Sequence, residues 1–229
     1  MSKICCIFGA GEYSDNIIMP ESPNVIIASD GGYTKVCEMG LKANCVIGDF
    51  DSLGYVPDKE NVTFLPTEKD VTDMDAAVRT GLSLGCDVFY MYGTLGGRLD
   101  HSIANIQLCA RLSQKGMKGV LIGRDSAVFI LNAGEENVAA VGKSSVKFTE
   151  NFCGTVSVFA IGEGAVGVSE KGLKYTIDDY ELSAYDSLCV SNEFVGKDAE
   201  ISCKFGTLAI ILYDVGNTVK MFEGRLDAD

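Results

Sequence analysis

The 229-residue sequence contains a single histidine, His101, and its nine cysteines include no CxxC pair. A zinc site needs a closely spaced set of Cys and His ligands, so this composition argues against one. The sequence also lacks any run of Lys and Arg, and its formal net charge is −13. Such a chain repels polyanions, so we expect it to bind neither nucleic acid nor an anionic membrane surface.

Long apolar runs are also absent. No segment reaches the roughly 18 apolar residues of a membrane span, and the first residues lack the apolar length of a signal peptide. The cysteines are odd in number and lie mostly in apolar runs, which fits reduced, buried thiols. We therefore expect a soluble cytoplasmic protein.

Short apolar segments that end in glycine or aspartate fill the first part of the chain. They predict strands at residues 3–8, 25–29, 45–47, 62–65, 88–92 and 120–122, and helices at 32–39, 72–85 and 100–112. Thr72, three residues before Asp75, has capping-box spacing and predicts the start of the second helix. Asp100 or Ser102 could cap the third helix. Strands that alternate with helices in this way predict a doubly wound, mostly parallel sheet.

After residue 132 the pattern changes to short β-type runs separated by Gly, Asn and Asp turns. Strands are expected at residues 145–148, 155–160, 166–169, 188–191, 199–203 and 207–213, and no stretch has clear helical periodicity. This pattern predicts an all-β sandwich or barrel. We therefore expect two domains: an α/β domain over residues 1–134 and an all-β domain over residues 135–229.

Acidic side chains gather between residues 48 and 105, with a few cations among them. They are Asp49, Asp51, Asp70, Asp73 and Asp100, accompanied by Lys69, Arg98 and His101. Several of them follow predicted strands, and open parallel sheets bind ligands beyond the carboxyl ends of their strands. Carboxylates beside cations suit a divalent metal and a phosphate ester. The alternative is that each aspartate only caps a helix or forms an Asx-turn.

The local spacing refines this hypothesis. Asp49 and Asp51 alternate across one residue, so in an extended segment they would share a face and could contact one metal ion. Gly97 and Arg98 suit a backbone that passes close to phosphate and a guanidinium that binds it bidentately. His101 could hydrogen-bond a substrate or orient the preceding carboxylate.

A glycine pattern near the start imitates the dinucleotide-binding fingerprint. Gly9 and Gly11 follow the first strand, and an aspartate ends the next strand about twenty residues later. Ser14 replaces the third glycine, and Pro20 and Pro23 leave little room for the helix that the fingerprint requires. We therefore discount the dinucleotide interpretation.

Four motifs, taken together and in order, resemble those of the thiamin pyrophosphokinase family. They are Ser29-Asp30-Gly31-Gly32, Gly48-Asp49-Phe50-Asp51-Ser52, Lys69-Asp70-x-Thr72-Asp73 and Gly96-Gly97-Arg98-x-Asp100-His101. Later segments resemble the second-domain signatures of that family: Gly167-Val168, Gly172-Leu173-Lys174-Tyr175 and Ser191-Asn192-Glu193. Tyr175 stands where many relatives carry Trp, and it keeps an aromatic face.

The resemblance implies transfer of the pyrophosphoryl group of ATP to the hydroxyethyl oxygen of thiamin, giving thiamin diphosphate and AMP with Mg²⁺. It implies metal ligands among Asp49, Asp51, Asp73 and Asp100, and catalytic roles for Asp73, Asp100 and Arg98. It implies that ATP and its phosphates are bound by Asp30, Gly31, Lys69, Asp70, Thr72, Gly97, Arg98 and His101. It implies that thiamin is bound by Tyr175, Ser191 and Asn192. It also implies a homodimer whose active site is shared between two chains.

Two points stay open at this level. Either Asp73 or Asp100 could accept the hydroxyl proton, and the other would then serve the metal. A metal-dependent nucleotide-sugar transferase that uses Asp49 and Asp51, or a thiamin- or nucleotide-binding sensor without catalysis, would fit the same carboxylates.

Overall fold

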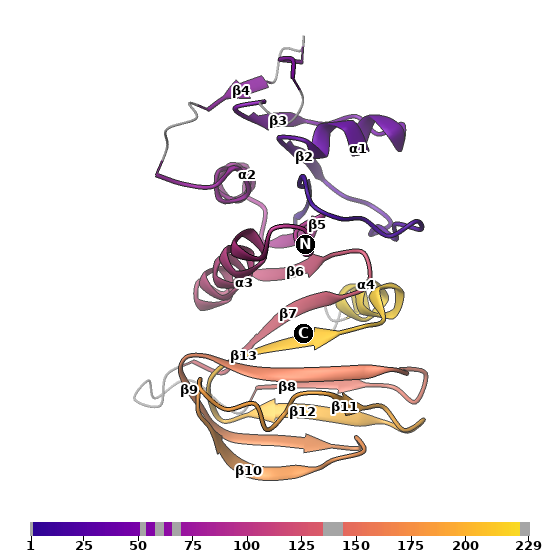
Figure 1. Ribbon diagram of the computed structural model, residues 1–229, viewed down its shortest axis with the longest axis vertical. Coiled ribbons are helices and arrows are strands. Elements are labelled where there is room, and N and C mark those ends of the chain that lie inside the picture. Colours follow the sequence, from indigo (N-terminus) through magenta and orange to yellow (C-terminus); the bar gives the residue numbers. More distant parts are fainter. Residues whose placement is uncertain (1, 51–53, 58–61, 66–69, 135–143, 225–229) are drawn as a thin grey trace. The chain divides into compact units, whose positions relative to one another are not determined.

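The computed structural model describes residues 2–50, 54–57, 62–65, 70–134 and 144–224 (Figure 1). The chain forms two compact units. The first consists of Met1–Leu108 with Met117–Arg124, and the second of Cys109–Gly116 with Asp125–Asp229. The functional boundary expected after residue 134 stays a prediction.

The first unit is built on a parallel sheet. Within the described residues its strand order is β4-β3-β2-β1-β5-β6, and every neighbouring pair is parallel. The strands are β1 (Ile4–Phe8), β2 (Val25–Ser29), β3 (Cys45–Gly48), β4 (Val62–Phe64), β5 (Val88–Tyr92) and β6 (Lys118–Ile122). β5 is buried along its whole length and is a continuous apolar run. Such runs are typical of parallel sheets, because helices or loops cover both faces.

This unit contains α1 (Gly32–Glu38) and α2 (Asp73–Ser83), which lie on opposite faces of the sheet (Figure 1), and the first part of α3 (Leu99–Gln114). The residues of α3 from Cys109 onward belong to the second unit. Thr72 is the N-cap of α2, and its hydroxyl accepts a hydrogen bond from the Asp75 N–H at 3.2 Å, which confirms the predicted cap. The predicted start of α3 is wrong. The helix begins at Leu99, and the Ser102 N–H already donates to the Arg98 carbonyl, so neither Asp100 nor Ser102 caps it.

The second unit is antiparallel in all its described pairings. Its strands are β7 (Ala127–Asn132), β8 (Ser144–Phe148), β9 (Thr155–Lys171), β10 (Ile177–Leu182), β11 (Asn192–Glu193), β12 (Ala199–Cys203) and β13 (Phe205–Leu212). The long strand β9 unites two predicted strands and pairs with β10, β11, β12 and β13. The strand predicted at residues 188–191 is absent, because Ser191 adopts a φ of 60° and the chain turns there.

The expectation of an all-β second domain is also wrong, since α4 (Val215–Gly224) follows β13. Asp214 caps this helix: its carboxylate accepts hydrogen bonds from the N–H and the side-chain amide of Asn217 at 3.2 and 2.7 Å. Thr218, Val219 and Phe222 are buried at helical spacing. That periodicity is visible in the sequence, but it is confined to two turns.

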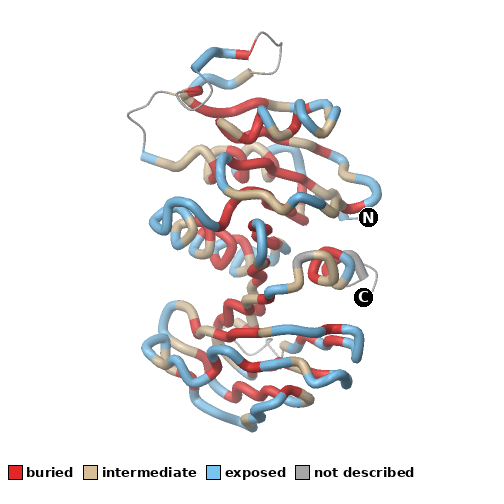
Figure 2. The backbone as a smooth tube through the Cα atoms, turned by 45° about the vertical axis from the view of Figure 1, so that its right-hand side comes forward, coloured by how far each residue is buried: buried red, intermediate tan, exposed pale blue. Residues whose placement is uncertain are grey.

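The buried residues follow the strands of both units (Figure 2). All nine cysteines are free, and six of them are buried. Burial raises the pKa of Cys203 to about 11, so this thiol stays protonated at neutral pH and packs as a small apolar side chain. Among the described residues, no helix is both long enough and apolar enough to cross a membrane.

Candidate functional site

The first unit contains a cavity of about 810 Å³ beyond the carboxyl ends of its central strands. It is lined by residues that follow β1, β2, β3 and β5, by the start of α2 and by one face of α3. Eight predicted site residues line it: Asp30, Asp49, Asp70, Thr72, Asp73, Gly97, Arg98 and His101. Gly31, at the N-cap of α1, and Asp100 are not among the lining residues. The predicted residues Asp51 and Lys69 lie outside the described residues.

Asp30 is held rigidly at the end of β2. Its N–H donates to the Ile47 carbonyl of β3 at 2.7 Å, and its φ of 49° is in the left-handed region, which few residues other than glycine adopt. The side chain is 7% exposed, and its Oδ1 accepts no hydrogen bond from the described part of the chain. A buried carboxylate oxygen without a donor is costly, so this atom calls for a cation or a hydroxyl supplied by a ligand.

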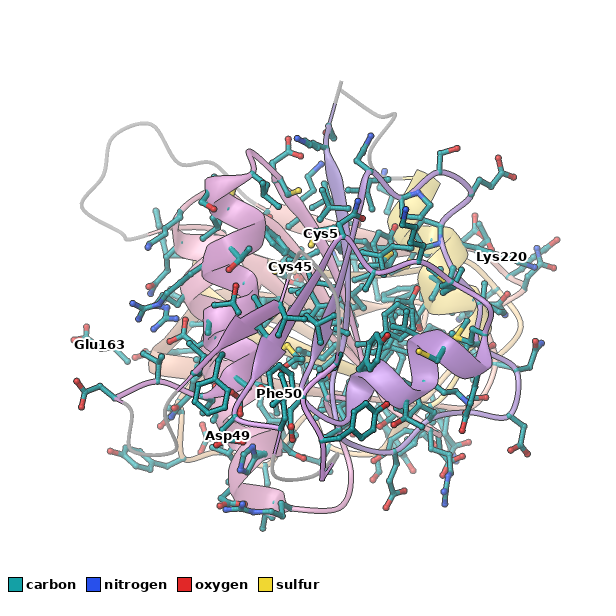
Figure 3. All side chains as sticks on the ribbon, turned by 90° about the horizontal axis from the view of Figure 1, so that it is seen from above. Cys5, Cys45, Asp49, Phe50, Glu163 and Lys220 are labelled. Atoms are coloured by element: carbon teal, nitrogen blue, oxygen red, sulfur yellow. The ribbon has the colours of Figure 1, made fainter. Side chains whose placement is uncertain are left out.

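Asp49 follows β3 directly. Figure 3 labels Cys45 at the amino end of this strand and Asp49 just beyond its carboxyl end, with Phe50 beside it. Phe50 has a φ of 60° and is 3% exposed, so its ring is buried while the backbone turns sharply. The buried ring anchors the turn after Asp49.

The start of α2 forms another wall. Asp70, Thr72 and Asp73 line the cavity, and Asp73 is the first residue of the helix. The N–H groups of a first helical turn carry partial positive charge, which favours anions. Asp75 is in the same turn but is not among the lining residues, and it forms an ion pair with Arg79 at 3.1 Å.

The loop after β5 contributes glycines and Arg98. Gly93, Gly96 and Gly97 all have positive φ angles, so the backbone turns in a way that L-residues rarely follow. The Arg98 guanidinium donates two hydrogen bonds to Asp100, at 3.2 and 2.6 Å, and both side chains are exposed. This guanidinium lowers the pKa of Asp100 below its ordinary value.

Two features of the cavity were missed by the sequence interpretation. The first is Asn105, which is buried and donates from Nδ2 to the Thr94 carbonyl at 2.8 Å, fixing the loop after β5. Helical spacing could have found it, because residues 98, 101 and 105 stand three and four apart and therefore share one face.

The second is the glycine loop after β1. The N–H groups of Gly9 and Gly11 donate to the carbonyls of Tyr92 and Gly93 at 2.8 and 2.9 Å, and a Cβ on Gly11 would lie only 2.5 Å from the Gly93 oxygen. These glycines let two loops pack backbone against backbone at the cavity. No helix joins β1 to β2 in the described residues 9–24, so the helix that the dinucleotide fingerprint requires is absent there, as expected. Gly9 and Gly11 nevertheless line the cavity.

Two of the predicted metal ligands, Asp49 and Asp73, line the cavity. Among the described residues, no three His, Cys, Asp or Glu side chains are gathered as a metal-binding cluster. The cavity carboxylates are hard oxygen donors without a thiolate, which is the donor chemistry that Mg²⁺ prefers.

The three residues predicted to bind thiamin adjoin one another in the second unit. Tyr175 and Ser191 are exposed, whereas Asn192 is 3% exposed. The Tyr175 N–H donates to Asn192 Oδ1 at 3.0 Å, and the Ser191 N–H donates to Ser157 Oγ at 3.0 Å. The backbones that carry the two exposed side chains are therefore fixed.

Comparison with known proteins adds independent findings. A family model described as the thiamin pyrophosphokinase catalytic domain matches residues 19–121, and one described as the thiamin pyrophosphokinase vitamin B1 binding domain matches residues 143–208. Together the two matches span well over half of the chain. The thiamine pyrophosphokinase of Bacillus subtilis (strain 168) is 25% identical over 191 residues, which cover 81% of this chain and 85% of that protein. Thiamin pyrophosphokinase 1 of Caenorhabditis elegans is 24% identical over 178 residues, or 73% of this chain and 70% of that protein.

Solved structures share the fold. The crystal structure of thiamine pyrophosphokinase from Bacillus subtilis superposes with a TM-score of 0.73 at 24% identity, covering 91% of this chain and 98% of that chain. Thiamin pyrophosphokinase from Candida albicans superposes with a TM-score of 0.72 at 14% identity, covering 93% of this chain and 90% of that chain. The fold is thus kept where the sequences have largely diverged.

Proposed function

This chain belongs to the thiamin pyrophosphokinase family and is a thiamin diphosphokinase, and we propose that the cavity of its first unit binds ATP and the metal. The observation that carries this proposal is the convergence of eight predicted residues on one cavity, inside the part of the chain that matches the family's catalytic domain. The reaction transfers the pyrophosphoryl group of ATP to the hydroxyethyl oxygen of thiamin and yields thiamin diphosphate and AMP. The matches favour neither alternative, the nucleotide-sugar transferase or the sensor without catalysis.

The phosphates of ATP need positive charge and N–H donors. Arg98 and Lys69 would supply the charge, and the backbone at Gly97 and Thr72 would supply the donors, with His101 beside them. Arg98 donates to Asp100 in the ligand-free protein and would donate to a phosphate when ATP binds. The guanidinium would therefore be paired both before and after binding.

Asp30, Asp70 and Gly31 complete the proposed nucleotide site. A carboxylate repels phosphate, so Asp30 is expected to meet the nucleotide through a ribose hydroxyl or through the metal, either of which would satisfy its buried Oδ1. Asp70 is exposed at the mouth of the cavity and could accept a hydroxyl in the same way.

Asp49, Asp51, Asp73 and Asp100 would hold Mg²⁺. When bound, the ion neutralises charge on the polyphosphate and helps to align it, which is the main requirement of phosphoryl transfer. The side chains of the protein hold the nucleotide and exclude water. One carboxylate must also accept the proton of the thiamin hydroxyl.

The lining of the cavity favours Asp73 as that base. Asp73 lines the cavity at the start of α2, whereas Asp100 is exposed and is not among the lining residues. In the second unit, Tyr175 and Ser191 would contact thiamin, the first through its ring face and the second through its hydroxyl. Asn192, also expected at this site, would act beside them.

We propose in addition that the protein works in the cytoplasm as a homodimer that uses thiamin and ATP. The α/β domain (1–134) of one chain would face the β-rich domain (135–229) of its partner. The dimer rests on the family resemblance, and the location rests on the reduced state expected for the cysteines.

The activity is tested by incubating the protein with ATP, Mg²⁺ and thiamin and separating the nucleotides. AMP that forms only when thiamin is present, in equal amount to thiamin diphosphate, is the expected result. ADP in place of AMP, or turnover of a nucleotide sugar without any thiamin-dependent product, would contradict the assignment.

A further inference from the structure

The second unit contains a buried carboxylate, Glu170, that does not line the cavity. Glu170 of β9 is 2% exposed, and its cross-strand neighbours are Ile177 of β10 and Ile201 of β12. Charged side chains are rarely buried among apolar strands unless they are hydrogen-bonded to something specific. Oε2 of Glu170 accepts a hydrogen bond from Asn192 Nδ2 at 2.6 Å, so the partner of this carboxylate is a predicted thiamin residue.

The side chain of Asn192 is fully occupied by the protein. Its Oδ1 accepts from the N–H groups of Tyr175 and Glu193 at 3.0 and 2.9 Å. Its Nδ2 donates to Glu170 and to the Tyr175 carbonyl, the latter at 2.7 Å. An amide side chain offers two donors and two acceptor lone pairs, and all four are used. Asn192 therefore has no hydrogen bond left for a substrate and acts on Tyr175 instead.

Glu170 reinforces the direction in which this amide faces. The backbone N–H and carbonyl of Tyr175 already favour the observed orientation, with Oδ1 toward the N–H and Nδ2 toward the carbonyl. An ionised carboxylate only accepts hydrogen bonds, so Glu170 favours the same orientation and holds the second hydrogen of the NH₂ group. A reversed amide would place two oxygens against each other and two N–H groups against each other.

The outcome is a fixed backbone that carries an exposed ring. Both polar backbone groups of Tyr175 are bound by Asn192, while the residue is 61% exposed. The preceding residue is bound to the same strand: the Lys174 N–H donates to the Glu193 carbonyl at 3.0 Å, and its ammonium pairs with the Glu193 carboxylate at 2.7 Å. That ammonium lies 5.5 Å from the centre of the Tyr175 ring, so the ring already faces a cation.

We propose that Glu170 is a positioning residue that, through the side chain of Asn192, holds Tyr175 as a preformed aromatic surface for a flat, cationic heteroaromatic ring. This inference rests on the proposed function in that thiamin is such a molecule. A surface fixed before binding avoids the loss of freedom that a mobile side chain would suffer in the complex.

Kinetics of two substitutions test the proposal. Glu170→Leu removes the acceptor, and we expect KM for thiamin to rise roughly three- to tenfold, with kcat and KM for ATP unchanged. Glu170→Gln keeps an oxygen that can accept from Asn192, and it should stay within about twofold of the wild type. Ile201→Val is the matched control, because it trims a buried neighbour of Glu170 on β12 without touching the hydrogen bonds. A rise in thiamin KM for Ile201→Val equal to that for Glu170→Leu would overturn the proposal.

A second readout does not depend on thiamin. The chain contains no tryptophan, so Tyr175→Trp introduces a single fluorescent reporter at the proposed surface. In the ligand-free protein we expect Glu170→Leu in this background to increase the amplitude of nanosecond depolarisation, and Glu170→Gln not to. If the wild type forms no thiamin-dependent AMP but the depolarisation changes as expected, the function fails and the positioning stands. If the wild type is active but neither KM nor depolarisation responds to Glu170→Leu, the positioning is refuted.

Discussion

At the scale of single residues, Asp73 carries the most direct expectation. Asp73→Asn removes a proposed base and metal ligand while keeping the shape of the side chain at the start of α2. We expect kcat to fall by about 10²- to 10⁴-fold, because general-base and charge-neutralising roles are of that size. The measurement is thiamin-dependent AMP formation under saturating ATP.

Asp75→Asn is the control for this change. It lies in the same turn, pairs with Arg79 and is not among the residues that line the cavity, so it should keep the wild-type rate. Near-normal turnover by Asp73→Asn, or an equal loss in both variants, would remove Asp73 from the mechanism.

Glu170 gives an expectation for stability. Burial raises the pKa of this carboxyl above its ordinary value of 4.5, while hydrogen bonds from Asn192 and the Cys189 thiol oppose the shift. A carboxyl with a raised pKa in the folded state favours folding most below its ordinary pKa, and this contribution is lost as the pH rises through the raised value. Relative to Glu170→Gln, which does not titrate, the wild type should therefore lose unfolding free energy as the pH rises from about 4.

Urea unfolding of both proteins at pH 4, 6 and 8 measures this difference. The unfolding free energy of the wild type minus that of Glu170→Gln should fall with rising pH. If it stays constant or rises, ionisation of the buried carboxyl does not destabilise the folded protein. Ionised Glu170 would then be stabilised by more than its hydrogen bonds from Asn192 and Cys189.

At the scale of elements, the contact between the loops after β1 and β5 gives a testable prediction. Gly11→Ala would place a methyl group 2.5 Å from the Gly93 oxygen, so the loops after β1 and β5 must separate. Because both loops line the cavity, we expect KM for ATP to rise about tenfold or more. The assay is initial velocity against ATP concentration.

Gly40→Ala separates this effect from simple destabilisation. Gly40 has a φ of +66° with open space around it, so alanine there should lower stability by about 1 kcal/mol without moving the cavity. If it raised KM for ATP as much as Gly11→Ala does, loss of stability rather than the loop contact would explain both.

Elements with strong local signals were predictable from the sequence. The strands β2, β5 and β12 match their expected ranges. β2 and β5 are almost entirely apolar, and β12 alternates apolar residues with Glu200 and Ser202. The start of α2 was predictable because Thr72 supplies a local cap. The run at residues 188–191 misled, since Leu188 and Val190 are exposed beside a turn and only Cys189 is buried.

In the candidate site, too, residues with a local sequence signal were predicted and others were missed. Aspartates at strand ends were found because the topology of a parallel sheet brings such ends together. Asn105 was missed although its helical spacing from His101 is visible, because that spacing does not show that its amide binds the Thr94 carbonyl. Glu170 was missed because its partner Asn192 is 22 residues away in the sequence, and a contact of that kind leaves no periodic pattern.

At the scale of the whole molecule, the proposed dimer can be tested by mixing subunits. Asp73→Asn damages the α/β domain and Tyr175→Ala damages the β-rich domain, so each variant alone has two defective sites per dimer. If each active site combines the α/β domain of one chain with the β-rich domain of its partner, a mixed dimer contains one site with both defects and one with neither. Random exchange makes half of the dimers mixed, so about a quarter of the wild-type activity should return.

The activity is measured at low thiamin, where Tyr175→Ala is most impaired, after the two variants have been co-expressed or allowed to exchange. A sample made from two portions of Asp73→Asn, treated identically, gives the background. Recovery near a quarter requires sites shared between chains. No recovery, with light scattering showing that mixed dimers have formed, would mean that each chain carries its own complete site, because every site in a mixed dimer would then keep one defect.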